Sequence, residues 1–148
     1  MVDSAVGQFE DLSPRMVMTP WFDHEIPMTE AAEIGTRKVI TDHATVGVVV
    51  TTDGTITDIP REDYREAEER VIRELQDIGK PFVVLVNSAQ PEDPRAAAAA
   101  AEIQTRYGVT CRCVNCLTLT EEDIGDILRD LLYQFPLREL DVFLPEWV

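Results

Sequence analysis

Polar side chains follow two apolar runs of this chain, at the point where each run ends. Thr51, Thr52 and Asp53 close the run TVGVVVTT, and Asn87 and Ser88 close the run FVVLV. Hydroxyl, amide and carboxylate groups bind polar ligands through hydrogen bonds, so these five residues are the candidates for a binding site. The structural alternative is a strand end followed by a turn, which an Asp-Gly pair favours without any ligand.

Three cysteines lie close together at positions 111, 113 and 116. A C-x-x-C pair is a frequent zinc-binding spacing, but three thiols without a nearby histidine leave the fourth ligand unaccounted for. Cys111 and Cys113 are two residues apart on a predicted strand, so they face the same side. We interpret them as small apolar side chains and predict no metal site.

The two histidines do not form a catalytic pattern. His24 lies between Asp23 and Glu25 in a predicted loop, and His43 follows a predicted helix end, where a cation is favoured. Neither is accompanied by a serine or cysteine in a recognisable nucleophile motif. We therefore predict no catalytic residue in this chain.

Strands and helices alternate along the chain and would position the candidates. The two apolar runs are rich in β-branched residues, which is typical of strands buried on both faces. Apolar side chains spaced three and four apart predict helices after Pro60, Asp93 and Thr120. A further helix is predicted from Glu30 to about Thr41, and the predicted strands span residues 45–52, 82–86 and 109–117.

This alternation predicts an α/β fold with a mostly parallel sheet. Right-handed crossovers place helices on both faces of such a sheet, which gives three layers. Ligands bind beyond the carboxyl ends of its strands, because the loops that follow the strands meet there. The five candidate residues would therefore come together at one edge of the sheet.

Composition excludes several classes of protein. The 148 residues suit a single domain, and the net charge of -15 argues against duplex nucleic acid and against anionic membrane surfaces. The N-terminus MVDSAVGQFEDL lacks the features of a secretory signal, and no apolar run approaches the roughly 20 residues of a membrane span. The sequence predicts a cytoplasmic protein with reduced cysteines and no transmembrane segment.

Nearly the whole chain resembles the ATPase domain of the stage IV sporulation protein A family, the spore-coat morphogenetic ATPases of endospore-forming bacteria. The resemblance rests on long runs: TPWFDHEIP, EAAEIGTRKVI, TTDGTITDIPREDY and GKPFVVLVNS. It implies a partial P-loop NTPase fold of the GTPase-like class, with ATP and Mg²⁺ as cofactors of the full-length family. It also implies a base layer of the spore coat on the forespore surface in the mother cell, with self-association or other coat morphogenetic proteins as partners.

The phosphate-binding loop of that class is absent from this sequence. No G-x-x-x-x-G-K-[ST] motif occurs, and the Gly79-Lys80 pair is followed by Pro81. Such a loop aims backbone N–H groups and a lysine at the phosphates. We therefore interpret the chain as a fragment of the ATPase domain that is not a competent ATP hydrolase alone and binds no cofactor tightly. A non-catalytic binding or assembly module and a non-functional gene fragment are the alternatives.

The resemblance also implies roles for the candidate residues. Asn87 matches the asparagine of the N-K-x-D motif of GTPases, whereas Ser88 and Gln90 replace its lysine and aspartate. Because that aspartate reads the guanine edge, its loss implies adenine. We expect the nucleotide-binding residues to be Asn87, Ser88, Thr51, Thr52 and Asp53.

The same resemblance divides the chain into three parts. Residues 1–28 are expected to be an irregular N-terminal segment that follows the missing metal-binding strand. Residues 29–136 are the C-terminal half of the ATPase domain. Residues 137–148 begin the junction to a missing middle domain.

Overall fold

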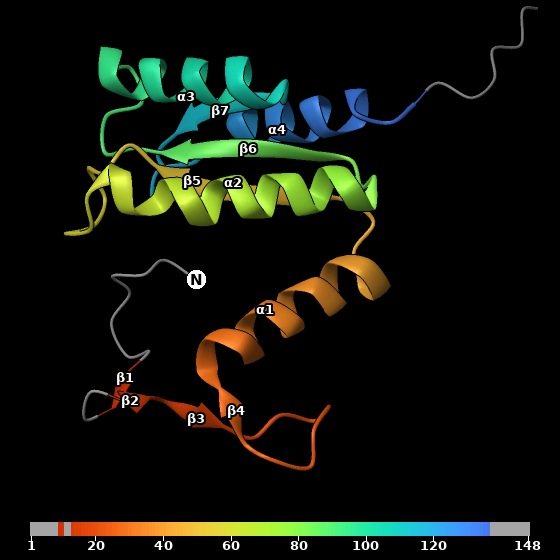
Figure 1. The fold of residues 1–148 in the computed structure, drawn as a ribbon. Coiled ribbons are helices and arrows are strands. Elements are labelled where there is room, and N and C mark those ends of the chain that lie inside the picture. The colour runs from red at the N-terminus through yellow and green to blue at the C-terminus, as the bar shows by residue number, and fades with distance from the viewer. Residues whose placement is uncertain (1–8, 11–12, 137–148) are drawn as a thin grey trace, which may run out of the picture.

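The computed structural model describes residues 9–10 and 13–136, which Figure 1 shows as a ribbon. Its strands are β1 (Phe9–Glu10), β2 (Ser13–Pro14), β3 (Met16–Val17), β4 (Ile26–Pro27), β5 (Gly47–Thr52), β6 (Phe82–Asn87) and β7 (Cys111–Val114). Its helices are α1 (Met28–Lys38), α2 (Arg61–Ile78), α3 (Pro94–Tyr107) and α4 (Glu121–Tyr133), with the short π-helix η1 (Val39–His43) directly after α1.

Strands β5, β6 and β7 form a parallel sheet in which β6 is the central strand. The register pairs Val50 with Leu85, and Leu85 with Arg112, so equivalent positions form rows across the sheet. Helices α2 and α3 cover one face of the sheet and α4 covers the other (Figure 1). This arrangement confirms the predicted α/β class with a parallel sheet between two helical layers.

The central strand β6 carries the core on both of its faces. All five residues from Phe82 to Val86 are buried. Val84 belongs to the same apolar cluster as Ile72 of α2, and Leu85 to the same cluster as Ile127 of α4. An unbroken apolar run, rather than an alternating one, is therefore what this strand requires.

Two helix starts follow their sequence signals. The Asp93 carboxylate accepts a hydrogen bond from the backbone N–H of Arg95, and Pro94 is the first residue of α3. Thr120 and Asp123 form the capping box of α4, in which each side chain accepts from the other residue's backbone N–H. These contacts satisfy N–H groups that have no partner inside the helix.

Helix α1 starts before Glu30, where the sequence predicted its first residue. The helix begins at Met28, after Pro27, and no side chain caps it. The backbone N–H of Met28 instead donates to the carbonyl of Arg15 at 2.8 Å, beside the antiparallel β3–β4 pair. The carbonyl of Arg15, which lies between β2 and β3, thus satisfies the first N–H of the helix.

The segment from β1 to α1 extends away from the sheet (Figure 1). Strands β1 and β2 form one antiparallel pair and β3 and β4 another. Two ion pairs join α1 to α2: Arg37 with Glu74 at 3.5 Å, and Glu33 with Arg70 at 2.8 Å. No helix within the described residues is long and apolar enough to cross a bilayer.

We expect Ile72→Ala to lower the free energy of unfolding by about 2–5 kcal/mol, because it leaves a cavity between α2 and β6. Ile72 is 0% exposed. Val50→Ala is the matched control: Val50 is 57% exposed, and its loss should cost less than about 0.5 kcal/mol. Urea unfolding of the two variants measures both values. Equal losses would contradict the packing described for β6.

Candidate functional site

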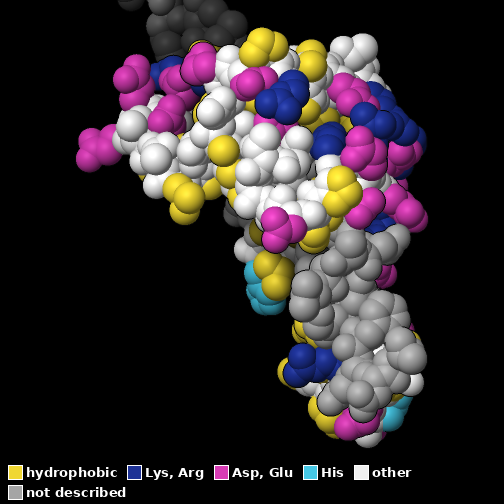
Figure 2. Space-filling model, turned by 90° about the vertical axis from the view of Figure 1, so that its left-hand side faces the viewer, with side chains coloured by type: hydrophobic (Ala, Val, Ile, Leu, Met, Phe, Trp, Pro, Cys, Tyr) yellow, Lys and Arg dark blue, Asp and Glu magenta, His cyan; other side chains and the backbone are white. Residues whose placement is uncertain are grey.

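The five candidate residues meet at the carboxyl edge of the sheet. Thr52 of β5 lies opposite Asn87 of β6 in the register, and Asp53 and Ser88 follow these two residues directly. Figure 2 views the molecule from this side, where acidic side chains lie at several points around uncharged side chains and backbone. Thr51 and Thr52 are each 5% exposed and Ser88 is 0% exposed. The side chains of Asn87 and Asp53 are less buried.

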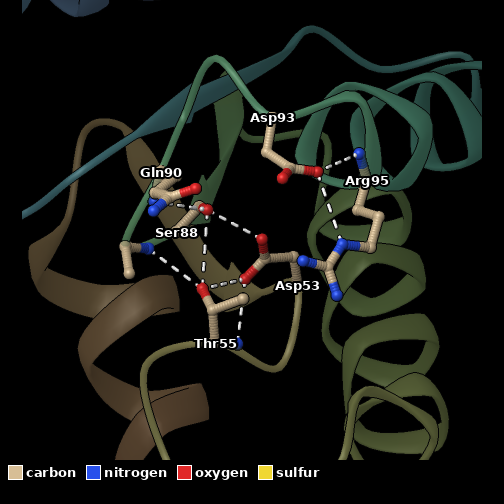
Figure 3. A network of polar contacts seen from close by, with 7 residues as sticks. Asp53, Thr55, Ser88, Gln90, Asp93 and Arg95 are labelled. Carbon is tan, nitrogen blue, oxygen red and sulfur yellow. Dashed lines mark hydrogen bonds and ion pairs between the residues drawn. The ribbon is translucent and has the colours of Figure 1, made fainter.

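Asp53 is the centre of a hydrogen-bond network that joins the loops after β5 and β6 (Figure 3). Its Oδ1 accepts from the backbone N–H of Thr55 at 3.0 Å and from the Thr55 hydroxyl at 2.6 Å. Its Oδ2 accepts from the Ser88 hydroxyl at 2.7 Å. The Thr55 hydroxyl oxygen accepts from the N–H of Ala89 at 2.9 Å, and that of Ser88 accepts from the N–H of Gln90 at 3.1 Å. The two loops are therefore fixed to each other without a ligand.

The same contacts set the charge of Asp53. Burial acts to raise its pKa, but the hydrogen bonds from Thr55 and Ser88 outweigh it, and the pKa of Asp53 lies below its ordinary value. The carboxylate is therefore ionised at neutral pH, with both oxygens already accepting hydrogen bonds. Asp53 therefore acts as an anion that holds the two loops in place, and not as a base that is free to accept a proton.

Asn87 connects β6 to the loop after β7. Its Oδ1 accepts a hydrogen bond from the backbone N–H of Cys116 at 3.0 Å. In the same loop, Asn115 donates from its amide nitrogen to the carbonyl of Ala89 at 3.4 Å and accepts from the N–H of Leu117 at 3.0 Å. The two asparagines thus hold the β6 and β7 loops together, and this contact gives Asn87 a structural role.

A buried ion pair lies beside this edge and was not among the sequence candidates. Arg61, the first residue of α2, donates to the two carboxylate oxygens of Glu68 at 2.6 and 2.9 Å and to the hydroxyl of Thr51 at 3.2 Å. The side chains of Arg61 and Glu68 are 12% and 4% exposed. Their spacing of seven residues, two helical turns, was the available signal. The pair anchors the end of β5 to α2.

A cavity of about 270 Å³ opens at the carboxyl ends of β6 and β7. None of the five candidate residues lines it; its walls are Ala89, Pro91, Glu92, Cys113, Val114, Asn115, Thr118 and Asp123. Two of these side chains are carboxylic acids, so the cavity disfavours anions. Its chemistry suits an uncharged polar group better than a phosphate.

The three cysteines differ in how far they are exposed to solvent. Cys111 is buried in the cluster with α2 and α3, and burial raises the pKa of its thiol to about 12. Burial also raises the pKa of Cys113, and Cys116 is exposed. Within the described part of the chain, no group of three histidine, cysteine, aspartate or glutamate side chains is placed to hold a metal ion. Cys111 thus behaves as an apolar core residue, as predicted.

The histidines lie apart from the Asp53 network. His24 packs its ring against Phe22, with the ring centroids 5.5 Å apart. His43 is the last residue of η1, before β5 begins. Among the contacts that the structure describes at the carboxyl edge, none comes from either histidine side chain.

Comparison with known proteins identifies the family. The family model described as "Stage IV sporulation protein A, ATPase domain" matches residues 1–136. The chain belongs to this family. It is 48% identical over 147 residues to stage IV sporulation protein A of Bacillus subtilis (strain 168), 47% identical over 147 residues to that of Bacillus anthracis, and 43% identical over 148 residues to that of Clostridioides difficile (strain 630).

The alignments cover 99–100% of this chain and 30% of each of these stage IV sporulation proteins. The chain therefore spans about 30% of the length of the curated relatives it matches. No solved structure matches it.

We expect Asp53→Asn to lower the melting temperature at neutral pH. The pKa of Asp53 is lowered in the folded state, whereas an unfolded aspartate titrates at about 3.9, so the charge stabilises the fold above that pH. This stability is lost as the pH falls through the folded pKa. The difference between variant and wild type should therefore shrink below about pH 4. Thermal melts across this range measure it.

Asp58→Asn is the control for this experiment, because Asp58 is an exposed carboxylate in the same loop. It should leave the melting temperature nearly unchanged at every pH. A difference between Asp53→Asn and wild type that stays constant down to strongly acidic pH would contradict the role assigned to the Asp53 charge.

We expect Glu68→Leu to destabilise the fold by about 3–5 kcal/mol, because it leaves the Arg61 charge buried without its partner. The double variant Arg61→Met/Glu68→Leu should recover most of this loss, since it replaces the ion pair with an apolar pair. A double-mutant cycle from urea unfolding tests this. Equal losses in the single and double variants would show that Arg61 reaches solvent once Glu68 is gone.

Proposed function

We propose that this chain is the C-terminal part of the ATP-binding domain of a sporulation ATPase, and that it holds the base side of the nucleotide. Family membership supports this assignment. The observation that carries it is the position of Asn87 at the end of the central strand, beside Thr52, in loops that the Asp53 network fixes in advance. Ser88, Thr51 and Thr52 are buried, so we propose that they position this edge rather than contact the nucleotide.

The chemistry of the edge suits the base better than the phosphates. Mg²⁺ is held by oxygen ligands, mostly carboxylates, and a triphosphate requires cationic or N–H donors. The Asp53 oxygens already accept hydrogen bonds from Thr55 and Ser88, and among the described residues no group of three histidine, cysteine, aspartate or glutamate side chains is placed to hold a metal ion. The nearby cavity has two acidic walls, Glu92 and Asp123, which disfavour a phosphate. The described residues therefore fit neither Mg²⁺ nor the phosphates. We propose that other parts of the family protein hold the metal ion and the phosphates, and that the isolated chain does not hydrolyse ATP.

The proposed cellular role follows from the relatives. They are named for stage IV of sporulation. We propose that ATP hydrolysis by the complete protein drives assembly of the basement layer of the spore coat on the forespore, in the cytoplasm of the mother cell. Its partners in this role would be further copies of the protein or other coat morphogenetic proteins.

A chimera tests the proposed function. In the Bacillus subtilis relative, the 147 matched residues are replaced by this chain. We expect Asn87→Ala in the chimera to weaken ATP binding about tenfold, as the loss of a hydrogen bond to the base would do. The melting temperature should stay nearly unchanged, because Cys116, whose backbone N–H donates to Asn87, is exposed and can donate to water instead. Equilibrium ATP binding and thermal melts are the measurements.

Gln134→Ala is the control, because it also removes an amide but lies near the amino end of β6. It should leave the affinity for ATP unchanged. If Asn87→Ala kept its affinity for ATP and clearly lowered the melting temperature, the role of Asn87 would be limited to its contact with Cys116. Phosphate release by the isolated chain, abolished by changing one of its residues, would contradict the proposed division of the site.

A further inference from the structure

The ion pair of Arg61 and Glu68 is not explained by stability alone. Its side chains are 12% and 4% exposed, so both charges have been removed from water. An apolar pair of similar volume is often as stable or more stable at such a position, because it avoids this loss of hydration. An apolar pair cannot donate hydrogen bonds, however, whereas Arg61 also donates to the Thr51 hydroxyl at 3.2 Å. The contacts that only Arg61 can make therefore indicate the role of the pair.

Arg61 fixes the first turn of the loop that follows β5. This loop comprises residues 53–60, between the last residue of β5 and Arg61, the first residue of α2. The Arg61 side chain binds Thr51, at the end of the strand that leads into the loop. The loop then returns to the same residue, because a Cβ at Gly54 would lie 3.2 Å from the backbone nitrogen of Arg61. The side chain and the backbone of one residue thus contact both the strand end and the turn.

The same turn carries the residues that meet the loop after β6 (Figure 3). Asp53 and Thr55 lie on either side of Gly54 in the sequence. Asp53 accepts from the Ser88 hydroxyl at 2.7 Å, and the Thr55 hydroxyl accepts from the N–H of Ala89 at 2.9 Å. A turn that moved away from Arg61 would therefore break both contacts between the two loops.

The contacts continue from the β6 loop to Asn87. The carbonyl of Ala89 accepts from the side-chain amide of Asn115 at 3.4 Å, and Asn87 accepts from the N–H of Cys116 at 3.0 Å. The loops after β5, β6 and β7 are thus connected in series. The place of Asn87 at this edge depends on contacts that begin at α2.

We propose that Arg61 is a positioning residue for the nucleotide edge, and that Glu68 holds its guanidinium in the required orientation. The two carboxylate oxygens of Glu68 bind two nitrogens of Arg61, and this geometry fixes a planar guanidinium. The pair keeps the loop of residues 53–60 against α2, and that loop keeps the β6 loop where Asn87 can meet the base. The inference rests on the proposed function for the ligand. The coupling between α2 and the loops, however, needs no nucleotide and can be measured without one.

Amide hydrogen exchange in the chain alone tests the coupling. The double variant Arg61→Met/Glu68→Leu should keep most of the stability, so it separates the order of the loops from the stability of the fold. We expect the amides of Thr55 and Ala89, which are bonded within the network, to exchange about tenfold faster or more in this variant. The amide of Val84 lies in the buried centre of β6 and reports global unfolding. Its exchange should change no more than the free energy of unfolding requires.

Substitutions of Thr51 test the contact from the other side. Thr51→Val removes the hydroxyl that Arg61 binds and keeps the shape of the side chain. Exchange at Ala89 should rise in this variant by a smaller factor than in the double variant, because Glu68 still holds the guanidinium. Thr51→Ser keeps the hydroxyl and should keep the wild-type ratio of exchange at Ala89 to exchange at Val84.

A second ion pair of α2 provides the matched control. Arg65 binds Glu102 of α3 at 3.1 Å, and the side chains are 48% and 39% exposed. Arg65→Met/Glu102→Leu makes the same chemical change on the same helix, away from the loop after β5. Exchange at Ala89 should stay at the wild-type rate in this variant.

The chimera with the Bacillus subtilis relative connects the coupling to ATP. We expect Arg61→Met/Glu68→Leu to weaken ATP binding about tenfold in the chimera, because the edge must then be ordered when the nucleotide binds. Asn87→Ala is measured beside it. Weaker binding in Asn87→Ala with wild-type affinity in the double variant would overturn the positioning role and leave the proposed function standing. Wild-type affinity in both would overturn the proposed function and, with it, the connection of the coupling to ATP.

Two results from the chain alone would overturn the proposal without reference to ATP. Wild-type exchange at Ala89 in Arg61→Met/Glu68→Leu would show that the loops are ordered without Arg61. Exchange that rises by the same factor at Ala89 and Val84 would show that the pair acts on the stability of the whole fold.

Discussion

Burial of β6 on both of its faces is the constraint on which the rest of this structure depends. A strand whose consecutive residues Phe82 to Val86 are all buried needs a neighbour on each side and a helical layer on each face. Strands β5 and β7 and helices α2, α3 and α4 meet those needs. The resulting register brings Thr52 beside Asn87 at the carboxyl edge. Apolar packing thus determines where the polar side chains meet.

The polar side chains at that edge replace hydrogen bonds that the sheet no longer provides. Beyond the last pair of the ladder, Ser88 is fully buried, and its hydroxyl both donates to Asp53 and accepts from Gln90. Thr55 makes a similar pair of contacts, to Asp53 and to Ala89. Ser88 is buried and Thr55 is exposed, and the contacts of both converge on the Asp53 carboxylate, which links the two loops. The candidate site is consequently ordered before any ligand arrives.

Many of the strands and helix starts could be predicted from the sequence, because the signals for them are local. The continuous apolar runs, the Asp93 cap and the Thr120 capping box each act within a few residues of the structure they specify. The partners of Asp53 could not be predicted, because they depend on how the loop after β5 turns. Gly54 has a φ of +91°, and a Cβ there would lie 3.2 Å from the backbone nitrogen of Arg61. The loop path that brings Thr55 to Ser88 requires this residue.

Non-local contacts also decided the features that the sequence did not indicate. The start of α1 depends on the carbonyl of Arg15, thirteen residues earlier in the chain. The Arg61–Glu68 pair is buried because α2 packs on the end of β5, where Arg61 also donates to the hydroxyl of Thr51. Hydrophobic periodicity reports which face of a helix is buried, and it carries no information about such charges within that face.

The two flanks of α4 differ in what they contact. On the β7 side the helix presents Asp126 and Asp130, which bind Arg112; on the β5 side it presents Leu128 and its neighbours to solvent. Arg112 binds one flank of the helix through two carboxylates, and Ile127 and Leu131 pack on Val83 and Leu85 at the face between the flanks. The charged flank and the buried face therefore set the position of α4 on the sheet. The apolar flank stays exposed because the sheet residues that it approaches, Val48 and Val50, are themselves not covered by α4.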